Sequence, residues 1–100
     1  MGYHTILLVQ RDTPNSRMYF DLPSTQQAME RVVKLYEARL KIVNPRTEHI
    51  TYDVSDLFGF VDELGDLSAL VLDHETGQYA PHGKKWIKEL MLKYFHSQAR

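Results

Sequence analysis

Residues 50–73, ITYDVSDLFGFVDELGDLSALVLD, combine an amphipathic helix with a buried strand, and this combination decides the fold. Apolar residues in the first half recur at i, i+3, i+4, i+7 and i+10, the spacing that places them along one side of an α-helix. They are Val54, Leu57, Phe58, Val61 and Leu64. Asp53 is a candidate N-cap, and Gly65 is expected to break the helix near its C-terminus. Residues 67–72 then form an apolar run of strand length, so the segment is predicted to supply part of the core.

A β-hairpin is predicted at the N-terminus. Residues 3–10 have the pattern of a strand with apolar side chains on both faces, so both faces require cover. Residues 11–16 have turn composition, and residues 17–21 resume an alternating extended pattern. The two strands are therefore expected to pair.

A long helix is predicted to follow, beginning at Pro23 and Ser24 and ending at Asn44 and Pro45. Ser24 and Gln27 match the S-x-x-Q capping box. The apolar stripe of this helix consists of Met29, Val32, Val33, Tyr36 and Leu40. Its opposite side carries two acidic and basic pairs, Glu30 with Lys34 and Glu37 with Lys41. Such i, i+4 pairs are typical of a solvated helix face.

The last third of the chain is predicted to contain a short strand and a third helix. Residues 73–77 have turn composition, and residues 78–80 are expected to form a strand that Pro81 ends and that pairs with residues 67–72. The third helix begins at about Lys84 and carries one apolar side: Trp86, Ile87, Leu90, Met91, Tyr94 and Phe95. We expect Trp86 to pack against the sheet.

These elements predict one α+β domain over residues 1–100. The chain has 100 residues, of which 43% are hydrophobic, which suffices for a single modest core. The order of two strands, two helices, two strands and one helix favours a four-stranded antiparallel sheet. Its three amphipathic helices are expected to pack on one face and to leave the other face bare.

The bare face predicts a homodimer. If the helices cover one face, the outward apolar residues of the first strand would lie in water, and such patches usually mark interaction sites. The alternative is that a fourth helical stripe or a loop covers the face within the monomer, but no spare apolar segment remains for that role. We assign Leu7 and Val9 to the inner face. The dimer interface is predicted to contain His4, Ile6, Leu8, Gln10 and Tyr19.

Composition excludes several classes of function. The formal net charge of −1 gives no strong overall attraction for nucleic acid. The absence of cysteine removes disulfides, thiol catalysis and thiolate metal sites. The N-terminus lacks a basic region, and its apolar run is too short for a signal peptide or a membrane span, so a soluble intracellular protein without membrane contact is expected.

No motif names a reaction. The five histidines, His4, His49, His74, His82 and His96, lack metal-ligand spacing. The acidic residues Asp62, Glu63 and Asp66 have the placement of solvated side chains rather than of an acid/base pair. We therefore assign no catalytic, cofactor-binding or metal-binding residue. We also expect no deep pocket lined by two or more ionisable groups.

The C-terminal helix is locally basic. Its candidate phosphate contacts are Lys84, Lys85, Lys88 and Lys93. A solvated face, with cations placed favourably near a helix C-terminus, explains the same residues. Direct RNA binding through this helix is therefore the alternative function rather than the preferred one.

Several segments, in order, resemble the enhancer of rudimentary homolog family nearly from end to end. They are HTILLVQ at 4–10, NP at 44–45, ITYD at 50–53, the pattern LF-F-D-L-DLS-LV over 57–71, Tyr79, Pro81, and WIKE at 86–89. The resemblance implies a four-stranded sheet with three helices on one side that dimerises through the sheet. It also implies a small adaptor without enzymatic activity or cofactor.

The same resemblance implies partners and a location. Family members are mostly nuclear. We therefore expect this protein in the nucleus, and in the cytoplasm as a second location. Family members are linked to RNA surveillance, splicing, microRNA processing, transcription and the cell cycle, and the family name comes from a genetic link to pyrimidine biosynthesis. We expect partner proteins to bind through short peptide segments. The identity of the partner does not follow.

The chain departs from the family pattern at two kinds of position. The family is associated with casein-kinase-type phosphorylation, but position 18 is Met, and Ser24 is followed by Gln27 where that kinase requires an acidic residue. This regulation is therefore not transferred. Family members often carry cysteines near Val32 and Val33 and near Ala69. Small apolar residues at these positions fit a packing role.

Overall fold

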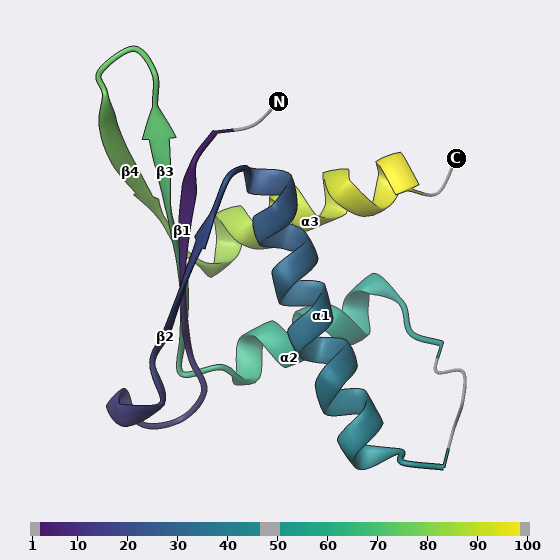
Figure 1. The fold of residues 1–100 in the computed structure, drawn as a ribbon. Helices are drawn as coiled ribbons and strands as arrows, with labels where there is room; N and C mark the ends of the chain where they lie inside the picture. The colour runs from purple at the N-terminus through teal and green to yellow at the C-terminus, as the bar shows by residue number, and fades with distance from the viewer. Residues whose placement is uncertain (1–2, 47–50, 99–100) are drawn as a thin grey trace.

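Four strands and three α-helices follow one another in the predicted order in a computed structural model that describes residues 3–46 and 51–98 (Figure 1). The elements are β1 (Thr5–Gln10), a 3-10 helix η1 (Pro14–Ser16), β2 (Met18–Leu22), α1 (Thr25–Val43), α2 (Val54–Glu63), β3 (Asp66–Asp73), β4 (Gln78–His82) and α3 (Lys84–Gln98). His49, and Ile50 at the start of the segment quoted above, lie outside the described residues.

The strands form one antiparallel sheet in the order β2-β1-β3-β4. β1 lies in the interior, where Thr5 pairs with Leu22 of β2 on one side and with Val71 of β3 on the other. The hairpin pairings β1 with β2 and β3 with β4 were both predicted and are confirmed. The central pairing of β1 with β3 joins segments that are about 60 residues apart in the chain.

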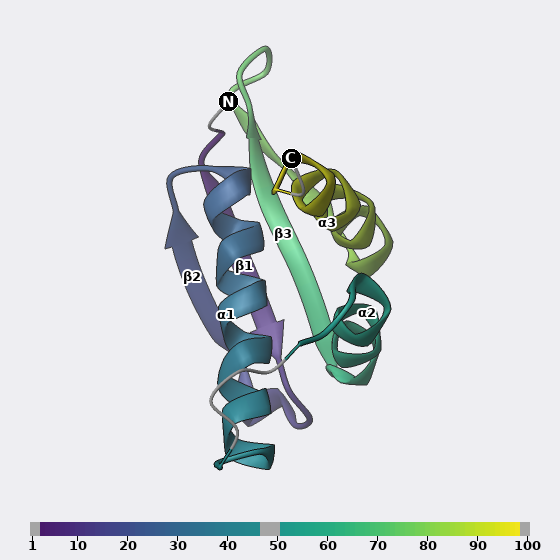
Figure 2. The ribbon, with the colours of Figure 1, turned by 90° about the vertical axis from the view of Figure 1, so that its right-hand side faces the viewer.

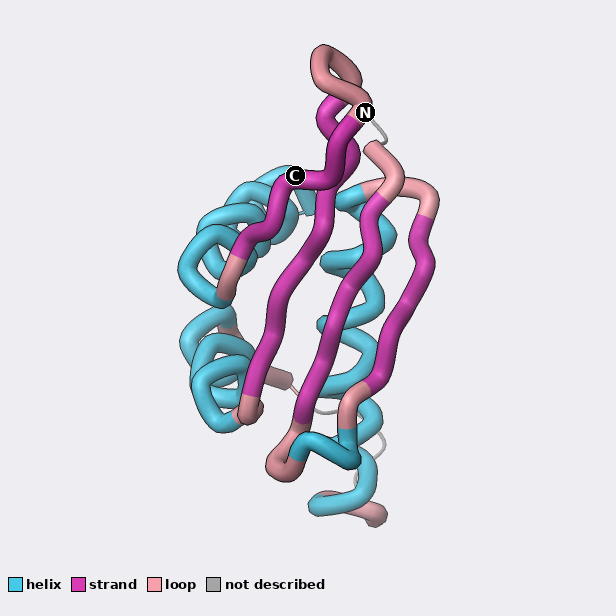
Figure 3. Tube along the Cα trace, turned by 90° about the vertical axis from the view of Figure 1, so that its left-hand side faces the viewer, coloured by secondary structure: helices cyan, strands magenta, loops and turns pink. Residues whose placement is uncertain are grey.

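All three helices lie on the same face of this sheet. In Figure 2, α1 crosses in front of β1 and β2, while α2 and α3 lie beside it, next to β3. Figure 3 shows the opposite face, where the four strands run without a helix in front of them. The predicted α+β arrangement is therefore confirmed.

The core lies between the sheet and the helices. Leu7 and Val9 of β1 are buried to 0% and 1% exposure, which confirms their assignment to the inner face. Val32 on α1 and Ala69 on β3, the positions associated with cysteine in the family, are fully buried in the same core. Val33, the third of these positions, is partly buried against the same core, so all three small apolar side chains take part in packing as the sequence predicts.

Both α1 and α2 begin at a side-chain cap. The carboxylate of Asp53 accepts from the backbone N–H of Asp56, and the Asp56 carboxylate accepts from that of Asp53, so α2 has a complete capping box. Hydrogen bonds from the Ser55 hydroxyl and the Asp56 N–H lower the pKa of Asp53. Ser24 accepts from the Gln27 N–H at the start of α1. The reciprocal half of the predicted box is not found among the described residues.

Gly65 acts differently from the prediction. α2 ends at Glu63, Leu64 is already extended, and within the described residues only Gly77 has a positive φ, of 71°. Gly65 instead lies close to the chain after β1, where its N–H donates to the carbonyl of Arg11 at 2.7 Å. A Cβ at this position would lie 3.1 Å from Nε2 of Gln10.

Two further expectations are corrected. The turn after β1 contains the 3-10 helix η1, which the turn composition did not reveal. Pro81 does not end the last strand, because β4 continues to His82, with Pro81 opposite Leu70. β4 is the outer strand of the sheet, where a residue without an N–H is tolerated. The His82 ring in turn stacks on Trp86 at a centroid distance of 4.0 Å, so Trp86 packs against the sheet as expected.

The solvated side of α1 also connects elements. The hydroxyl of Tyr52, before α2, donates to Glu37 at 3.0 Å, and Nη2 of Arg39 lies 3.1 Å from Oε2 of Glu63 on α2. Neither of the expected pairs, Glu30 with Lys34 or Glu37 with Lys41, is among the ion pairs of the described residues. Charged residues on this face therefore contact α2 and the segment before it.

Candidate functional site

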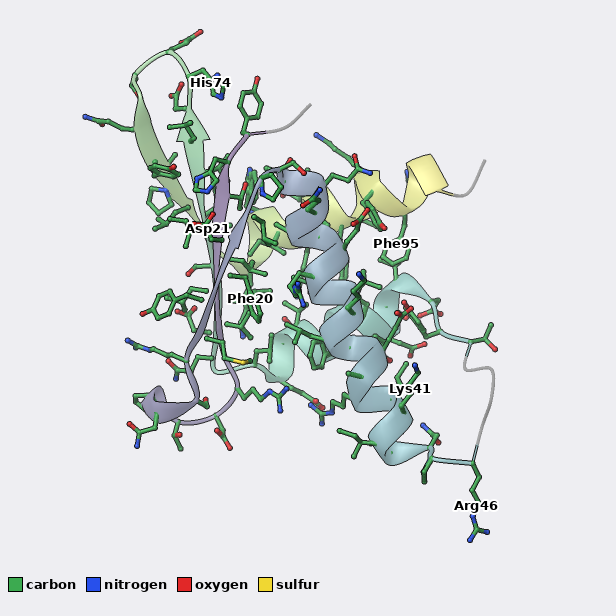
Figure 4. All side chains as sticks on the ribbon, in the orientation of Figure 1. Phe20, Asp21, Lys41, Arg46, His74 and Phe95 are labelled. Atoms are coloured by element: carbon green, nitrogen blue, oxygen red, sulfur yellow. The ribbon has the colours of Figure 1, made fainter. Side chains whose placement is uncertain are left out.

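The face of the sheet opposite the helices is the candidate functional site, and we call it the open face (Figure 3). Strand register and alternation place twelve side chains on it. They are His4 just before β1, Ile6, Leu8 and Gln10 on β1, Tyr19 and Asp21 on β2, Asp66, Ser68, Leu70 and Leu72 on β3, and Tyr79 and Pro81 on β4. Figure 4 shows Phe20 on the helix side of the sheet and Asp21 on the other side, as the alternation requires.

The centre of the open face is apolar. Ile6 is paired with Leu70 across the two interior strands, and Leu72 and Leu8 flank this pair along β3 and β1. Leu70 is 39% exposed, although it lies in the middle of the sheet. Tyr19 at one side of the face is 64% exposed. A contiguous apolar area on a flat sheet surface is typical of a protein interaction site.

A hydrogen-bond network centred on His4 occupies one end of the open face. Its Nε2 is hydrogen-bonded to the carboxylate of Asp21, and its Nδ1 lies 2.5 Å from the hydroxyl of Tyr79. Because a carboxylate only accepts, Nε2 donates, and in the neutral ring Nδ1 accepts from the tyrosine hydroxyl. The network joins β2 to β4 across the sheet.

The other end of the open face is polar too. Oε1 of Gln10 accepts from Nε of Arg17 at 2.7 Å. An apolar centre between two polar ends is the arrangement that protein interfaces have, with a dry core and a hydrated rim.

All five side chains predicted for the dimer interface lie on the open face, as predicted. They are His4, Ile6, Leu8, Gln10 and Tyr19. Their contact with a second subunit stays a prediction. The sequence analysis missed Leu70, Leu72, Asp21 and Tyr79. A signal was available for the two leucines, since an apolar run in residues 67–72 leaves every second side chain on the outer face.

The basic residues of α3 are not assembled into one phosphate-binding patch. Nζ of Lys84 donates to the carbonyl of Leu64 at 2.6 Å, which caps the C-terminal end of α2. Nζ of Lys88 lies 2.5 Å from Asp62 and 5.5 Å from the ring centre of Phe58. Two of the four candidate phosphate contacts thus bind α2 instead.

The remaining two candidate phosphate contacts, Lys85 and Lys93, are exposed on α3. Two separate exposed lysines form a weak electrostatic site, because affinity for phosphate backbones grows with the number of phosphates neutralised. The geometry therefore does not favour the RNA-binding alternative.

A pocket of about 240 Å³ lies where α1, α2 and the end of β1 meet, and we call it the α1–α2 pocket. It is lined by Leu35, Arg39, Ile42, Phe60, Glu63 and Arg11, among others. Three residues of this lining, Arg11, Arg39 and Glu63, are ionisable, but the volume is below the range of about 300–1,000 Å³ that is usual for small-molecule sites, so the expectation about a deep pocket stays a prediction. The ion pair between Arg39 and Glu63 joins the two helices at the wall of this pocket.

Residues 3–46 and 51–98 contain neither a metal-binding cluster nor a membrane-spanning helix. No group of three or more His, Asp or Glu side chains there is arranged to hold a metal ion. Among the helices of the same part of the chain, none combines the length and apolar character that spanning a membrane requires.

Comparison with known proteins agrees with the sequence resemblance. The family profile described as enhancer of rudimentary matches residues 1–100. The chain is 48% identical over 98 residues to the enhancer of rudimentary homolog of Echinococcus multilocularis, covering 96% of each chain. It is 53% identical over 87 residues to the protein enhancer of rudimentary of Drosophila virilis, covering 86% of this chain and 84% of the relative.

A plant relative is similar over the same length. The enhancer of rudimentary homolog of Arabidopsis thaliana is 44% identical over 98 residues, covering 97% of this chain and 87% of the relative. A full-length family match together with identities of this size, over a sheet and helices in the order that the resemblance implies, establishes that this chain belongs to the enhancer of rudimentary family.

Proposed function

We propose that the protein is a homodimeric adaptor that associates through the open face and holds partner proteins of nuclear RNA metabolism. The observation that carries the proposal is the apolar centre of the open face, in particular Leu70 at 39% exposure beside Ile6. No helix of the described part covers this face.

Self-association is the simplest way to cover such a face. A two-fold axis brings the same patch of both subunits together. The burial of each apolar side chain of the open face therefore contributes twice to the free energy of association. Complete burial of a leucine or isoleucine contributes on the order of 1.5–3 kcal/mol, and the half-buried Ile6 and Leu8 gain part of this on association. The polar ends at His4 and Gln10 then form the rim.

Family membership supports the adaptor role. The relevant processes are RNA surveillance, splicing, microRNA processing and transcription, with the cell cycle and the link to pyrimidine metabolism as further candidates. We propose a nuclear protein without enzymatic activity, metal or cofactor, whose partners bind as short peptide segments. An adaptor needs an apolar patch or groove rather than a set of converging catalytic groups.

The double substitution Ile6→Arg/Leu8→Arg tests the dimer. It places four arginines in the shared apolar patch, which removes the burial and adds repulsion, so the variant should sediment as a folded monomer. The control Val43→Arg/Leu92→Arg adds the same charge at exposed apolar positions on α1 and α3 and should remain dimeric. Circular dichroism verifies that each variant is folded. A dimeric Ile6→Arg/Leu8→Arg variant, or a monomeric wild type at tens of micromolar, would reject the proposal.

Affinity capture from nuclear extract, with and without nuclease, tests the adaptor role. Partner proteins should stay bound after nuclease treatment and should be lost from the monomeric variant. Partners released by nuclease would favour the RNA-binding alternative. That alternative also requires RNA affinity that falls steeply with salt and with neutralisation of Lys84, Lys85, Lys88 and Lys93.

A further inference from the structure

We propose that the α1–α2 pocket of each protomer binds an acidic peptide segment through one large apolar side chain. The inference rests on the proposed adaptor function and specifies where a partner binds and which chemistry it carries. The occupant is a linear peptide in which an aromatic residue is flanked by carboxylates.

Most of the residues that line the pocket are apolar. Leu35 and Ile42 of α1 and Phe60 of α2 are among them, while Arg39 and Glu63 form a charged part of its wall. Ile42 is 78% exposed, although it is one of the larger apolar residues of the chain. Ala38, which lies on the same side of α1, leaves room between them. An aromatic side chain entering here would cover Ile42 and contact the small exposed part of Phe60, whose ring centre lies 5.7 Å from the guanidinium of Arg39.

The volume of the pocket fits a single side chain of a peptide better than a free small molecule. Its volume is about 240 Å³. Sites for cofactors and drug-sized ligands usually span about 300–1,000 Å³, so this pocket is below their range. Peptide recognition in a groove between helices uses single anchoring side chains of this kind.

Charge at the rim selects an acidic peptide. The guanidinium of Arg11 makes no hydrogen bond or ion pair with any residue that the structure describes. Arg39 pairs with Glu63, but both side chains are more than half exposed, at 52% and 62%. An exposed ion pair contributes little to stability, so Arg39 can exchange Glu63 for a carboxylate of the partner at small cost. Two arginines against one glutamate leave the rim positive.

The pocket is built on a fixed frame and is separate from the open face. The carbonyl of Arg11 accepts from the N–H of Gly65 at 2.7 Å, which ties the end of β1 to the segment after α2. Both helices that line the pocket lie on the face of the sheet opposite the proposed dimer contact (Figures 2 and 3). A dimer therefore presents two such pockets.

The probe for the test is an acetylated, amidated pentapeptide with a tryptophan between two pairs of glutamates. The control probe carries lysines in place of the glutamates. Amide shifts of the ¹⁵N-labelled full chain at millimolar peptide should move for residues of the pocket with the acidic probe. Binding of the lysine probe should be at least about tenfold weaker, because a charge-assisted hydrogen bond contributes a factor of this size.

Two variants locate the site. Arg11→Glu should weaken the acidic probe about tenfold or more, whereas Lys41→Glu, with the same change of charge on an exposed part of α1, should have little effect. Ala38→Trp should fill the pocket and abolish binding while the circular dichroism spectrum stays unchanged. Equal binding of the two probes, shifts confined to the open face, or an unaffected Ala38→Trp variant would each overturn the proposal.

The outcome is separable from that of the proposed function. Sedimentation of the same samples reports the dimer independently of the peptide. A dimer that fails to bind the acidic probe rejects the pocket and leaves the adaptor proposal standing. A monomer that binds it supports the pocket and rejects the dimeric adaptor.

Discussion

Lys84 shows how tertiary contacts decide the role of a single residue. In the sequence it is one of four basic residues on a helix, but its Nζ lies 2.6 Å from the carbonyl of Leu64 and 3.4 Å from that of Asp62. The last carbonyls of a helix lack intrahelical donors and carry partial negative charge. Lys84 therefore acts as a cap of α2 supplied by α3.

Substitution of Lys84→Met keeps the length of the side chain and removes this cap. We expect the free energy of unfolding to fall by about 1 kcal/mol, the usual contribution of one intramolecular hydrogen bond. Urea denaturation followed by circular dichroism measures the change. The neighbouring Lys85→Met, at an exposed position, should change it by less than about 0.5 kcal/mol. Equal effects of the two substitutions would contradict the capping role.

At the scale of elements, aromatic packing joins α1 to α2 and to the segment before α2. Tyr36 of α1 packs edge-on against the Tyr52 ring at a centroid distance of 5.0 Å, and its ring is tilted by 36° against that of Phe60 of α2 at 5.2 Å. Burial, the hydrogen bond to Glu37 and the charge of that glutamate raise the pKa of Tyr52 to about 12. The ordinary tyrosine value is 10.0. The fold thus favours the protonated hydroxyl.

This pKa shift predicts the behaviour of the protein at alkaline pH. Because the pKa is higher in the folded state, the contribution of Tyr52 is complete below about pH 10 and is lost as the pH rises to about 12. Tyr52→Phe should therefore flatten the decline of stability above pH 10. The measurement is urea denaturation at a series of pH values.

The control for the alkaline measurement is Tyr3→Phe. The Tyr3 hydroxyl has no hydrogen-bond partner in the described part of the chain, so its removal should leave the wild-type profile unchanged. At neutral pH, Tyr52→Phe should cost about 0.5–1 kcal/mol for the lost hydrogen bond. A Tyr52→Phe profile identical to the wild type would show that this contact does not couple α1 to the segment before α2.

At the scale of the whole molecule, the two faces of one sheet differ in burial, because the helices cover only one of them. Alternate residues of β1 enter the core on one side and line the open face on the other. If the open face is a dimer contact, folded dimers and unfolded chains are linked by mass action. The Tm of the wild type should then rise with protein concentration, whereas that of Ile6→Arg/Leu8→Arg should not. A wild-type Tm that is independent of concentration would contradict the dimer.

The inner face should respond through stability alone. Leu7 is completely buried, so Leu7→Ala should lower the free energy of unfolding by about 2–5 kcal/mol through lost burial and a cavity. Leu92→Ala, at 37% exposure on α3, serves as the matched control and should cost far less. Chemical denaturation of both variants at one fixed concentration separates these effects from dissociation.

The sequence by itself determined the elements, their order and the inner and outer sides of β1. Hydrophobic periodicity is a local property, and it is strong in residues 54–64 and 67–72, where helix and strand spacing differ clearly. The same alternation separated Leu7 and Val9 from Ile6 and Leu8. Turn composition did not predict η1, and Pro81 was expected to end a strand that it continues, because edge position in a sheet is not a local property.

Only the tertiary structure decided which polar groups meet. The contacts of His4 with Tyr79 and of Lys84 with Leu64 join residues 75 and 20 positions apart, and no spacing rule reaches that far. The α1–α2 pocket likewise arises from three segments that meet only after the helices have packed on the sheet. Local patterns set the elements because backbone and burial preferences act over a few residues, whereas site geometry depends on the packing of the whole chain.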